Sequence, residues 1–238
     1  IAVLSPNMIG PFIAEKLMHY SFKIPFVLSA FFAIIALCTS LAYMEEGRKE
    51  AVNGMTAITG VKSIKLLLLL PFILGCVFST TFFFLPVYSM EKGIREIGFF
   101  YTVYTLSAIT TRLFLGRTAE RLPFHKRTPF LFLLIFLSVL FLSDMSSLRI
   151  AILSALIYGL GEGLAYPSVN AEILNRMPKE MVNIATGFYI GAFNMGTLLA
   201  PLPFGYLAEW YGYERVFFIL SALPLTGIFL VLRDRNFK

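Results

Sequence analysis

The chain has 238 residues, of which 58% are hydrophobic and 14% are charged, and its formal net charge is +6. Soluble domains average about 45–50% apolar and about 25% charged residues, so this composition, with a mean hydropathy of +0.77, is typical of a membrane protein. It excludes a soluble enzyme with one packed core and a nucleic-acid-binding tail, and it indicates that the positive charge lies in loops that orient membrane helices.

Eight apolar runs, separated by short polar loops, follow one another along the chain. Each is long enough, or nearly so, to cross about 30 Å of hydrocarbon as a helix. The stretches 66–70 and 131–136 are apolar at every position, which excludes the alternating pattern of a β-barrel. The sequence therefore predicts an all-α, polytopic membrane protein with spans at 1–17, 25–43, 66–88, 97–116, 128–142, 150–173, 184–207 and 216–232.

The loops between these spans differ in charge. Most of the 20 Lys and Arg residues lie in the set of loops that shares its side with the C-terminus. Cytoplasmic loops carry this excess, so we expect a multi-pass protein of the inner (plasma) membrane with a cytoplasmic C-terminus.

Two segments near the ends of the chain repeat each other in order. Pro11 precedes a polar turn and the pentapeptide FVLSA at 26–30, and Pro201 precedes a polar turn and FILSA at 218–222. One six-helix period separates the two copies. Parallel repeats of this kind build transporters whose substrate site lies between two halves, near the middle of the bilayer.

The segment 116–127, GRTAERLPFHKR, resembles the cytoplasmic loop motif G-x-x-x-D-R-x-G-R-K of the major facilitator superfamily, in its second-half copy. Gly116, Glu120 and Arg121 match, with Glu in place of Asp, while Pro123 stands where the second Gly is usual. The segments 159–178 and 187–201 resemble the tenth and eleventh helices of bacterial efflux-type members. The resemblance implies that Glu120 and Arg121 pair across the two halves and act as a cytoplasmic gate, whereas the alternative is a solvated positive loop.

The same resemblance implies a fold and a domain organisation. The chain would hold helices 5–12 of an expected twelve in a major-facilitator-type bundle, truncated at the N-terminus. Residues 1–43 would end the N-terminal six-helix domain as helices 5 and 6. Residues 44–65 would form a cytoplasmic linker, and residues 66–238 would form the C-terminal six-helix domain.

Glu162 is the first candidate for a functional residue. It falls near the centre of the span 150–173, where a carboxylate is costly and usually functional. Tyr158 and Tyr166 follow the same stripe of the helix at steps of four residues. No Lys or Arg lies at the depth of Glu162 in any predicted span, and Arg112 lies near a cytoplasmic end. We expect Glu162 to couple proton movement to a substrate, or else to be a neutral carboxyl that only hydrogen-bonds a neighbour.

Weaker candidates lie on neighbouring spans. Asn194 is near the middle of the span 184–207, and cavity lining and an interhelical hydrogen bond are both open for it. Two G-x-x-x-G pairs, Gly159/Gly163 and Gly187/Gly191, predict close helix packing. The candidates for proton coupling or substrate binding are Glu162, Asn194, Tyr158, Tyr101, Tyr104 and Thr81.

These observations lead to a function. We expect that the protein is not an enzyme and that it binds no cofactor, metal or nucleic acid. We expect a monomer in the bilayer whose partners are a small-molecule substrate and a proton or other coupling ion. The leading hypothesis is proton-coupled efflux of a small organic compound by alternating access. Proton-coupled uptake of a sugar or organic ion is the first alternative. A non-transporting membrane protein or an inactive fragment is the alternative of another class.

Overall fold

The structure, a computed structural model, describes residues 21–42 and 64–233 together with residues 13 and 17. The described part is helical and contains no strand, so the all-α fold is confirmed. Nearly all of the predicted span at 1–17 and of the 44–65 linker lies outside it. The helices are α2 (Ile24–Ala42), α4 (Leu69–Glu91), α5 (Gly98–Glu120), α6 (Phe124–Ser143), α7 (Leu148–Asn175), a 3-10 turn η1 (Lys179–Met181), α8 (Val182–Leu199), α9 (Pro201–Tyr211) and α10 (Tyr213–Arg233).

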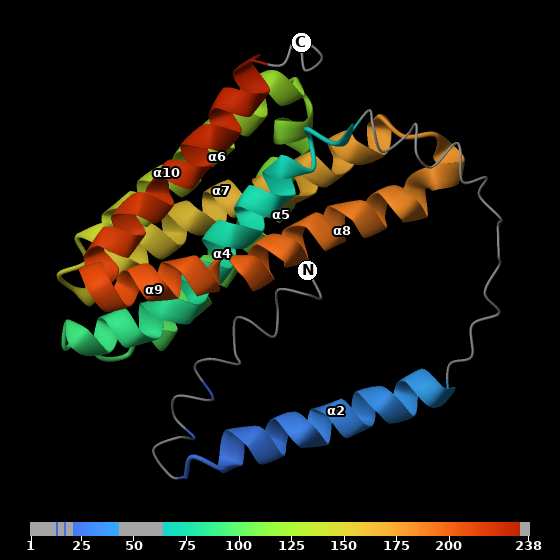
Figure 1. The fold of residues 1–238 in the computed structure, drawn as a ribbon. Coiled ribbons are helices and arrows are strands. Elements are labelled where there is room, and N and C mark those ends of the chain that lie inside the picture. The colour runs from blue at the N-terminus through green and yellow to red at the C-terminus, as the bar shows by residue number, and fades with distance from the viewer. Residues whose placement is uncertain (1–12, 14–16, 18–20, 43–63, 234–238) are drawn as a thin grey trace.

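Helices α4 to α10 form one bundle (Figure 1). Helix α7 packs against α5 on one side and α6 on another, while α4 packs against α8 and α10. Helix α6 also packs against α10, which closes the arrangement. Helix α2 lies apart from the bundle, and its side chains Phe26 and Phe32 are more than half exposed. The six candidate residues, which lie between residues 81 and 194, therefore all belong to the bundle.

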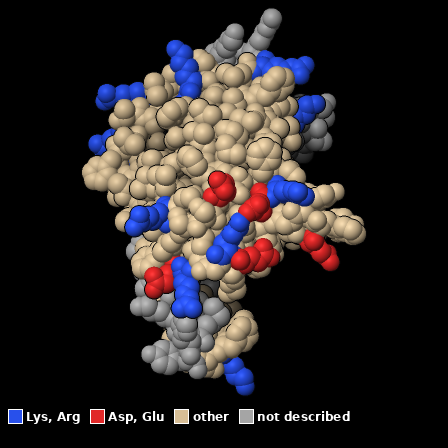
Figure 2. Space-filling model, turned by 90° about the vertical axis from the view of Figure 1, so that its left-hand side faces the viewer, with Lys and Arg blue, Asp and Glu red and all other residues tan. Residues whose placement is uncertain are grey.

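Four helices in the described part are long and apolar enough to cross a membrane: α4, α6, α7 and α10. Helix α5 carries Arg112, Arg117 and Glu120 in its second half, which lowers its hydropathy. The outer surface is apolar enough to contact lipid, because Phe114, Leu198 and many other large apolar side chains are exposed. Figure 2 shows a broad uncharged area on the upper part of this face, with Lys and Arg at its edges and acidic and basic side chains gathered below it.

The predicted span 184–207 is wrong as a single helix, because the structure divides it into α8 and α9. Pro201 has no N–H with which to continue the hydrogen-bond ladder. Ala200, the one residue between the two helices, keeps helical angles (φ −65°, ψ −40°), so the chain continues directly as α9. With α8 and α9 taken as one interrupted span, the bundle has six spans between residues 69 and 233.

Glycines allow two pairs of helices to approach closely. A Cβ on Gly75 of α4 would lie 2.0 Å from the Phe193 carbonyl oxygen of α8. A Cβ on Gly159 of α7 would lie 2.5 Å from the Tyr104 carbonyl oxygen of α5. The Gly159/Gly163 prediction is therefore confirmed. The Gly187/Gly191 prediction is not, because no atom of the described residues lies within 4 Å of a Cβ built on either glycine.

Two buried serines, Ser138 of α6 and Ser154 of α7, form hydrogen bonds that join the two helices. Their hydroxyl oxygens lie 2.9 Å apart, and each hydroxyl also lies 2.9 Å from the other serine's carbonyl oxygen. We expect Ser138→Ala to lower the free energy of unfolding by about 1 kcal/mol, since it breaks a cross-helix network. Ser143→Ala, which removes a bond to Leu140 within the same helix, is the control. Thermal unfolding in detergent measures both, and equal losses would contradict a special role for the serine pair.

Candidate functional site

Glu162 lies in the interior of α7 and is 5% exposed. The Tyr104 hydroxyl of α5 donates a hydrogen bond to Glu162 Oε2 at 2.9 Å. Small residues make this contact possible, because Gly159 and Gly163 let the backbone of α7 approach α5 to either side of Glu162. The carboxyl group is thus buried at the α5–α7 contact and held by a phenolic donor.

Aromatic rings surround this carboxyl group. The Tyr104 and Tyr158 rings meet edge-on, with centroids 5.5 Å apart. Phe82 of α4 meets the Tyr104 ring at 4.9 Å and the Tyr158 ring at 6.2 Å. We call Glu162, Tyr104, Tyr158 and Phe82 the Glu162 cluster. It joins three helices and excludes bulk water from the carboxyl group.

Tyr101 extends the Glu162 cluster along α5. Its hydroxyl donates to the Phe82 carbonyl oxygen at 2.9 Å, and its ring lies 5.2 Å from the Phe82 ring. The structure therefore brings four of the predicted site residues together: Glu162, Tyr158, Tyr104 and Tyr101.

Several buried hydroxyls near these helices have no hydrogen-bond partner in the described part of the chain. They belong to Tyr158 of α7, Thr105 of α5, and Thr80 and Thr81 of α4. A buried hydroxyl without a partner costs about 1–3 kcal/mol. These groups have donors and acceptors to offer a ligand or a water molecule when the helices move, and Thr81 is one of the predicted candidates.

Arg112 approaches Glu162 more closely than its sequence position indicated. Pro167 has no N–H, so the Gly163 carbonyl oxygen lacks the donor that an uninterrupted helix would supply. Arg112 Nε donates to that oxygen at 2.7 Å. The long side chain thus brings a guanidinium to the residue next to Glu162, whereas the sequence placed Arg112 only by the depth of its backbone. From the sequence, only Pro167 indicated that the carbonyl oxygen of residue 163 would lack its helical hydrogen-bond donor.

Asn194 does not join the Glu162 cluster. Its side chain is on an exposed part of α8, while α8 buries Ala185, Tyr189 and Gly196. The residue that α8 contributes instead is Tyr189, whose hydroxyl donates to the Tyr166 carbonyl oxygen at 2.8 Å. Tyr189 was not among the predicted site residues, although Tyr166, which faces it, lies on the predicted stripe of α7.

The predicted gating motif lies at the end of α5. Gly116 is within the helix with open space where a Cβ would stand, and Arg121 follows the helix and is exposed. The side chain of Glu120 is outside the described part, so the pairing of Glu120 and Arg121 across the two halves stays a prediction. A contact that the motif did not predict joins this region to α6: Arg127 donates a hydrogen bond to the Ala119 carbonyl oxygen at 2.9 Å. In the described residues, no group of three or more His, Cys, Asp and Glu side chains is placed to hold a metal ion.

A family model described as Major Facilitator Superfamily matches residues 2–190 and 95–238. The staphylopine export protein of Staphylococcus aureus is 22% identical over 240 residues, which are 93% of this chain and 60% of that protein. The D-galactonate transporter of Escherichia coli is 30% identical over 165 residues, which are 63% and 38% of the two chains. An uncharacterized MFS-type transporter of Salmonella typhimurium is 25% identical over 67% of this chain and 42% of its own length. The chain thus spans between about two fifths and three fifths of the length of these relatives.

Solved structures give the same fold. The human organic anion transporter MFSD10 matches with a TM-score of 0.66 at 16% identity, over 78% of this chain and 43% of that one. The peptide transporter POT matches with a TM-score of 0.63 at 18% identity, over 74% of this chain and 38% of that one. At these identities the likeness concerns the arrangement of the helices.

Proposed function

Because the chain belongs to the major facilitator superfamily, we propose that it forms part of a secondary active transporter that works by alternating access. It is a multi-pass membrane protein, and the relatives it matches are transporters rather than enzymes. The transported compound is a small organic molecule, and a proton gradient supplies the energy. The C-terminus is cytoplasmic, as the distribution of Lys and Arg in the loops indicates.

The observation that carries this proposal is the buried carboxyl group of Glu162. A charge in the apolar interior of a helical bundle is costly, while the protonated form is tolerated. The Tyr104 hydroxyl stabilises the charged form by donating to Oε2 at 2.9 Å. A carboxyl group that can be either charged or protonated can take up a proton in one state of the transporter and release it in another. Glu162 is therefore the proposed coupling residue.

The direction of transport is proposed as efflux. The name of the staphylopine export protein, which covers 93% of this chain, supports an exporter. Proton-coupled uptake of an organic ion is the alternative. The similarity to the D-galactonate transporter supports it, because that protein is more identical to this chain than the staphylopine export protein is, although over a shorter part. In both readings residues 66–238 form one six-helix half, residues 1–43 end the other half, and the protein acts as a monomer.

Proton movement in proteoliposomes tests transport and its direction. The complete gene product would be reconstituted with a pH-sensitive dye in the lumen, and organic cations, drugs, sugars and sugar acids would be added outside. An antiporter exports protons as substrate enters, so we expect the lumen to become more alkaline with at least one compound. Protein-free liposomes and a protonophore are the controls. Acidification would assign the uptake alternative, and no signal from folded protein with any compound would favour a non-transporting membrane protein.

A further inference from the structure

Pro167 interrupts the hydrogen-bond ladder of α7 shortly after Glu162. In a regular helix the N–H of residue 167 would donate to the carbonyl oxygen of residue 163, and proline has no N–H. Arg112 of α5 supplies the missing donor, because its Nε donates to the Gly163 carbonyl oxygen at 2.7 Å. A proline on one helix thus creates an acceptor that fixes an arginine of another helix.

The arginine held in this way lies close to the Glu162 carboxyl group. Gly163 directly follows Glu162 in the chain, and the Arg112 guanidinium and the Glu162 carboxylate attract each other electrostatically. Arginine keeps its charge inside a protein. In the described part of the chain, no other cation and no titratable group of α4 or α6 acts on Glu162. The other titratable groups that face it are phenols, namely Tyr104 of α5, Tyr158 and Tyr166 of α7, and Tyr189 of α8.

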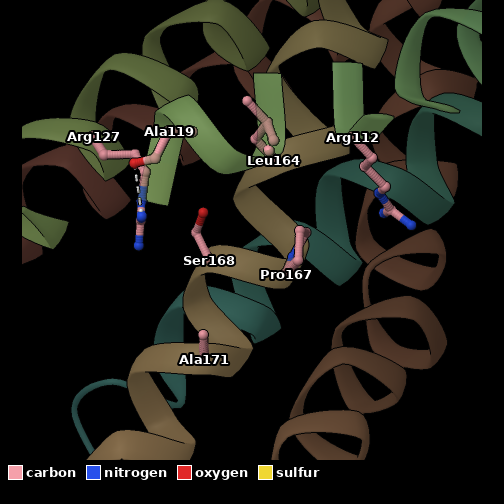
Figure 3. A pocket seen from close by; sticks show the side chains of 8 residues that line it. Arg112, Ala119, Arg127, Leu164, Pro167, Ser168 and Ala171 are labelled. Carbon is pink, nitrogen blue, oxygen red and sulfur yellow. Dashed lines mark hydrogen bonds between the residues drawn. The ribbon is translucent and has the colours of Figure 1, made fainter. Parts of the chain in front are cut away.

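A pocket of about 210 Å³ borders this arrangement (Figure 3). Arg112 and Pro167 both line the pocket, whereas Glu162 does not. Figure 3 shows the two residues across the pocket from Arg127. Because Arg112 borders open space, packing does not fix its guanidinium on that side. The bond to Gly163 therefore decides whether the charge stays next to Glu162 or turns into the pocket.

We propose that Pro167 is a positioning residue for Arg112, and that the two together favour the charged form of Glu162 in this arrangement of the helices. A carboxylate inside a dry bundle is costly unless a hydrogen-bond donor and a positive charge compensate it. Tyr104 supplies the donor at 2.9 Å, and Arg112 supplies the charge. A movement that separates α5 from α7 breaks the bond to Gly163 and favours proton uptake by Glu162. The use of this step in coupling rests on the proposed function, whereas the position of the charge does not.

Infrared spectroscopy of the complete gene product in detergent at neutral pH tests the proposal without transport. The carboxylic acid and carboxylate bands of Glu162 are identified by their loss in Glu162→Gln, and their ratio measures its charge state. Arg112→Gln should raise the ratio of protonated to charged Glu162 by about tenfold or more, the scale of one nearby opposite charge. Pro167→Ala should raise the ratio in the same direction, because the new N–H takes the Gly163 carbonyl oxygen and releases Arg112.

Two controls match the two substitutions. Pro224→Ala removes a proline from the interior of α10, and Arg117→Gln removes an exposed positive charge from the same helix as Arg112. Each should change the ratio by less than about twofold. Pro167 is exposed, and alanine is the better helix former, so the melting temperature of Pro167→Ala should not fall. A changed charge state in that variant is then not a consequence of unfolding.

Two outcomes would overturn the proposal. The first is a ratio that Pro167→Ala leaves unchanged, including a Glu162 that stays fully charged or fully protonated in every variant. The second is an equal response to Arg117→Gln and Arg112→Gln, which would assign the effect to the net charge of this end of the bundle. Proton-coupled flux in proteoliposomes is measured on the same variants. The expected ratios in a protein that transports nothing would support the positioning role of Pro167 and contradict the proposed function.

Discussion

Glu162→Gln is expected to lower proton-coupled transport sharply and to leave the bundle folded. Glutamine has almost the same shape, and its carbonyl oxygen can still accept the hydrogen bond from Tyr104. Its amide cannot gain or lose a proton, so the transport cycle lacks the group proposed to carry the coupling proton. Coupled flux should fall about 100-fold, the usual scale for losing a proton-transferring side chain, in the dye assay described above.

The matched control is Glu209→Gln, which neutralises an exposed carboxylate on α9. It should leave coupled flux within about twofold of wild type, as expected for a surface charge. Downhill exchange of labelled substrate, which needs no net proton movement, should persist in Glu162→Gln. If coupled flux is unchanged in Glu162→Gln, Glu162 serves only as a hydrogen-bond acceptor for Tyr104.

Tyr104→Phe separates the carboxyl group from its donor. The change preserves the ring that packs against Tyr158 and Phe82 and removes only the hydroxyl. A hydrogen bond to a charged group is worth about 1.5–3 kcal/mol, so coupled flux should fall by about tenfold or more. Tyr189→Phe removes a comparable buried hydroxyl that bonds a backbone carbonyl, and it should reduce stability without reducing coupling. Equal effects of the two changes on flux would contradict a special role for the Tyr104–Glu162 bond.

The sequence predicted features that depend on local periodicity. Helical spans follow from the length of apolar runs, and the proposed role of Glu162 follows from the cost of a carboxyl group at that depth. Its neighbours on α7 were predicted as one stripe, and Tyr158 does join the Glu162 cluster. Tyr166 instead packs its ring against Tyr189 of α8 at 4.9 Å. A step of four residues places side chains on a similar side of a helix, but the facing helices decide what each one contacts.

Contacts between distant segments could not be predicted from local sequence patterns. The bond from Tyr104 to Glu162 joins α5 to α7, and nothing in either local pattern pairs these two residues. Arg112 illustrates a second limit, because its backbone depth does not show how far its side chain extends. Asn194 illustrates a third limit. It is a polar residue in the middle of a span, and the structure places it on the exposed face of α8. In each case the missing information is how one helix faces its neighbours.

Gly75→Ala is expected to destabilise the bundle strongly. The added Cβ would stand 2.0 Å from the Phe193 carbonyl oxygen, and backbone atoms cannot move aside as a flexible side chain can. Helices α4 and α8 must therefore separate, at a cost of about 1–3 kcal/mol, which is typical of an overpacked core. Melting temperature should fall by about 2–4 °C for each kcal/mol in a chain of this size, as measured by thermal unfolding in detergent.

Gly187→Ala on α8 gives the same substitution without the contact. No described atom lies within 4 Å of its Cβ, and alanine is the better helix former by about 0.5–1 kcal/mol. The two changes should therefore have opposite signs, because packing decides the first and helix propensity decides the second. A loss of stability in Gly187→Ala equal to that in Gly75→Ala would mean that another segment packs on this side of α8. The sign of this one substitution thus tells whether the exposed Gly187–Gly191 side of α8 faces lipid or protein in the membrane.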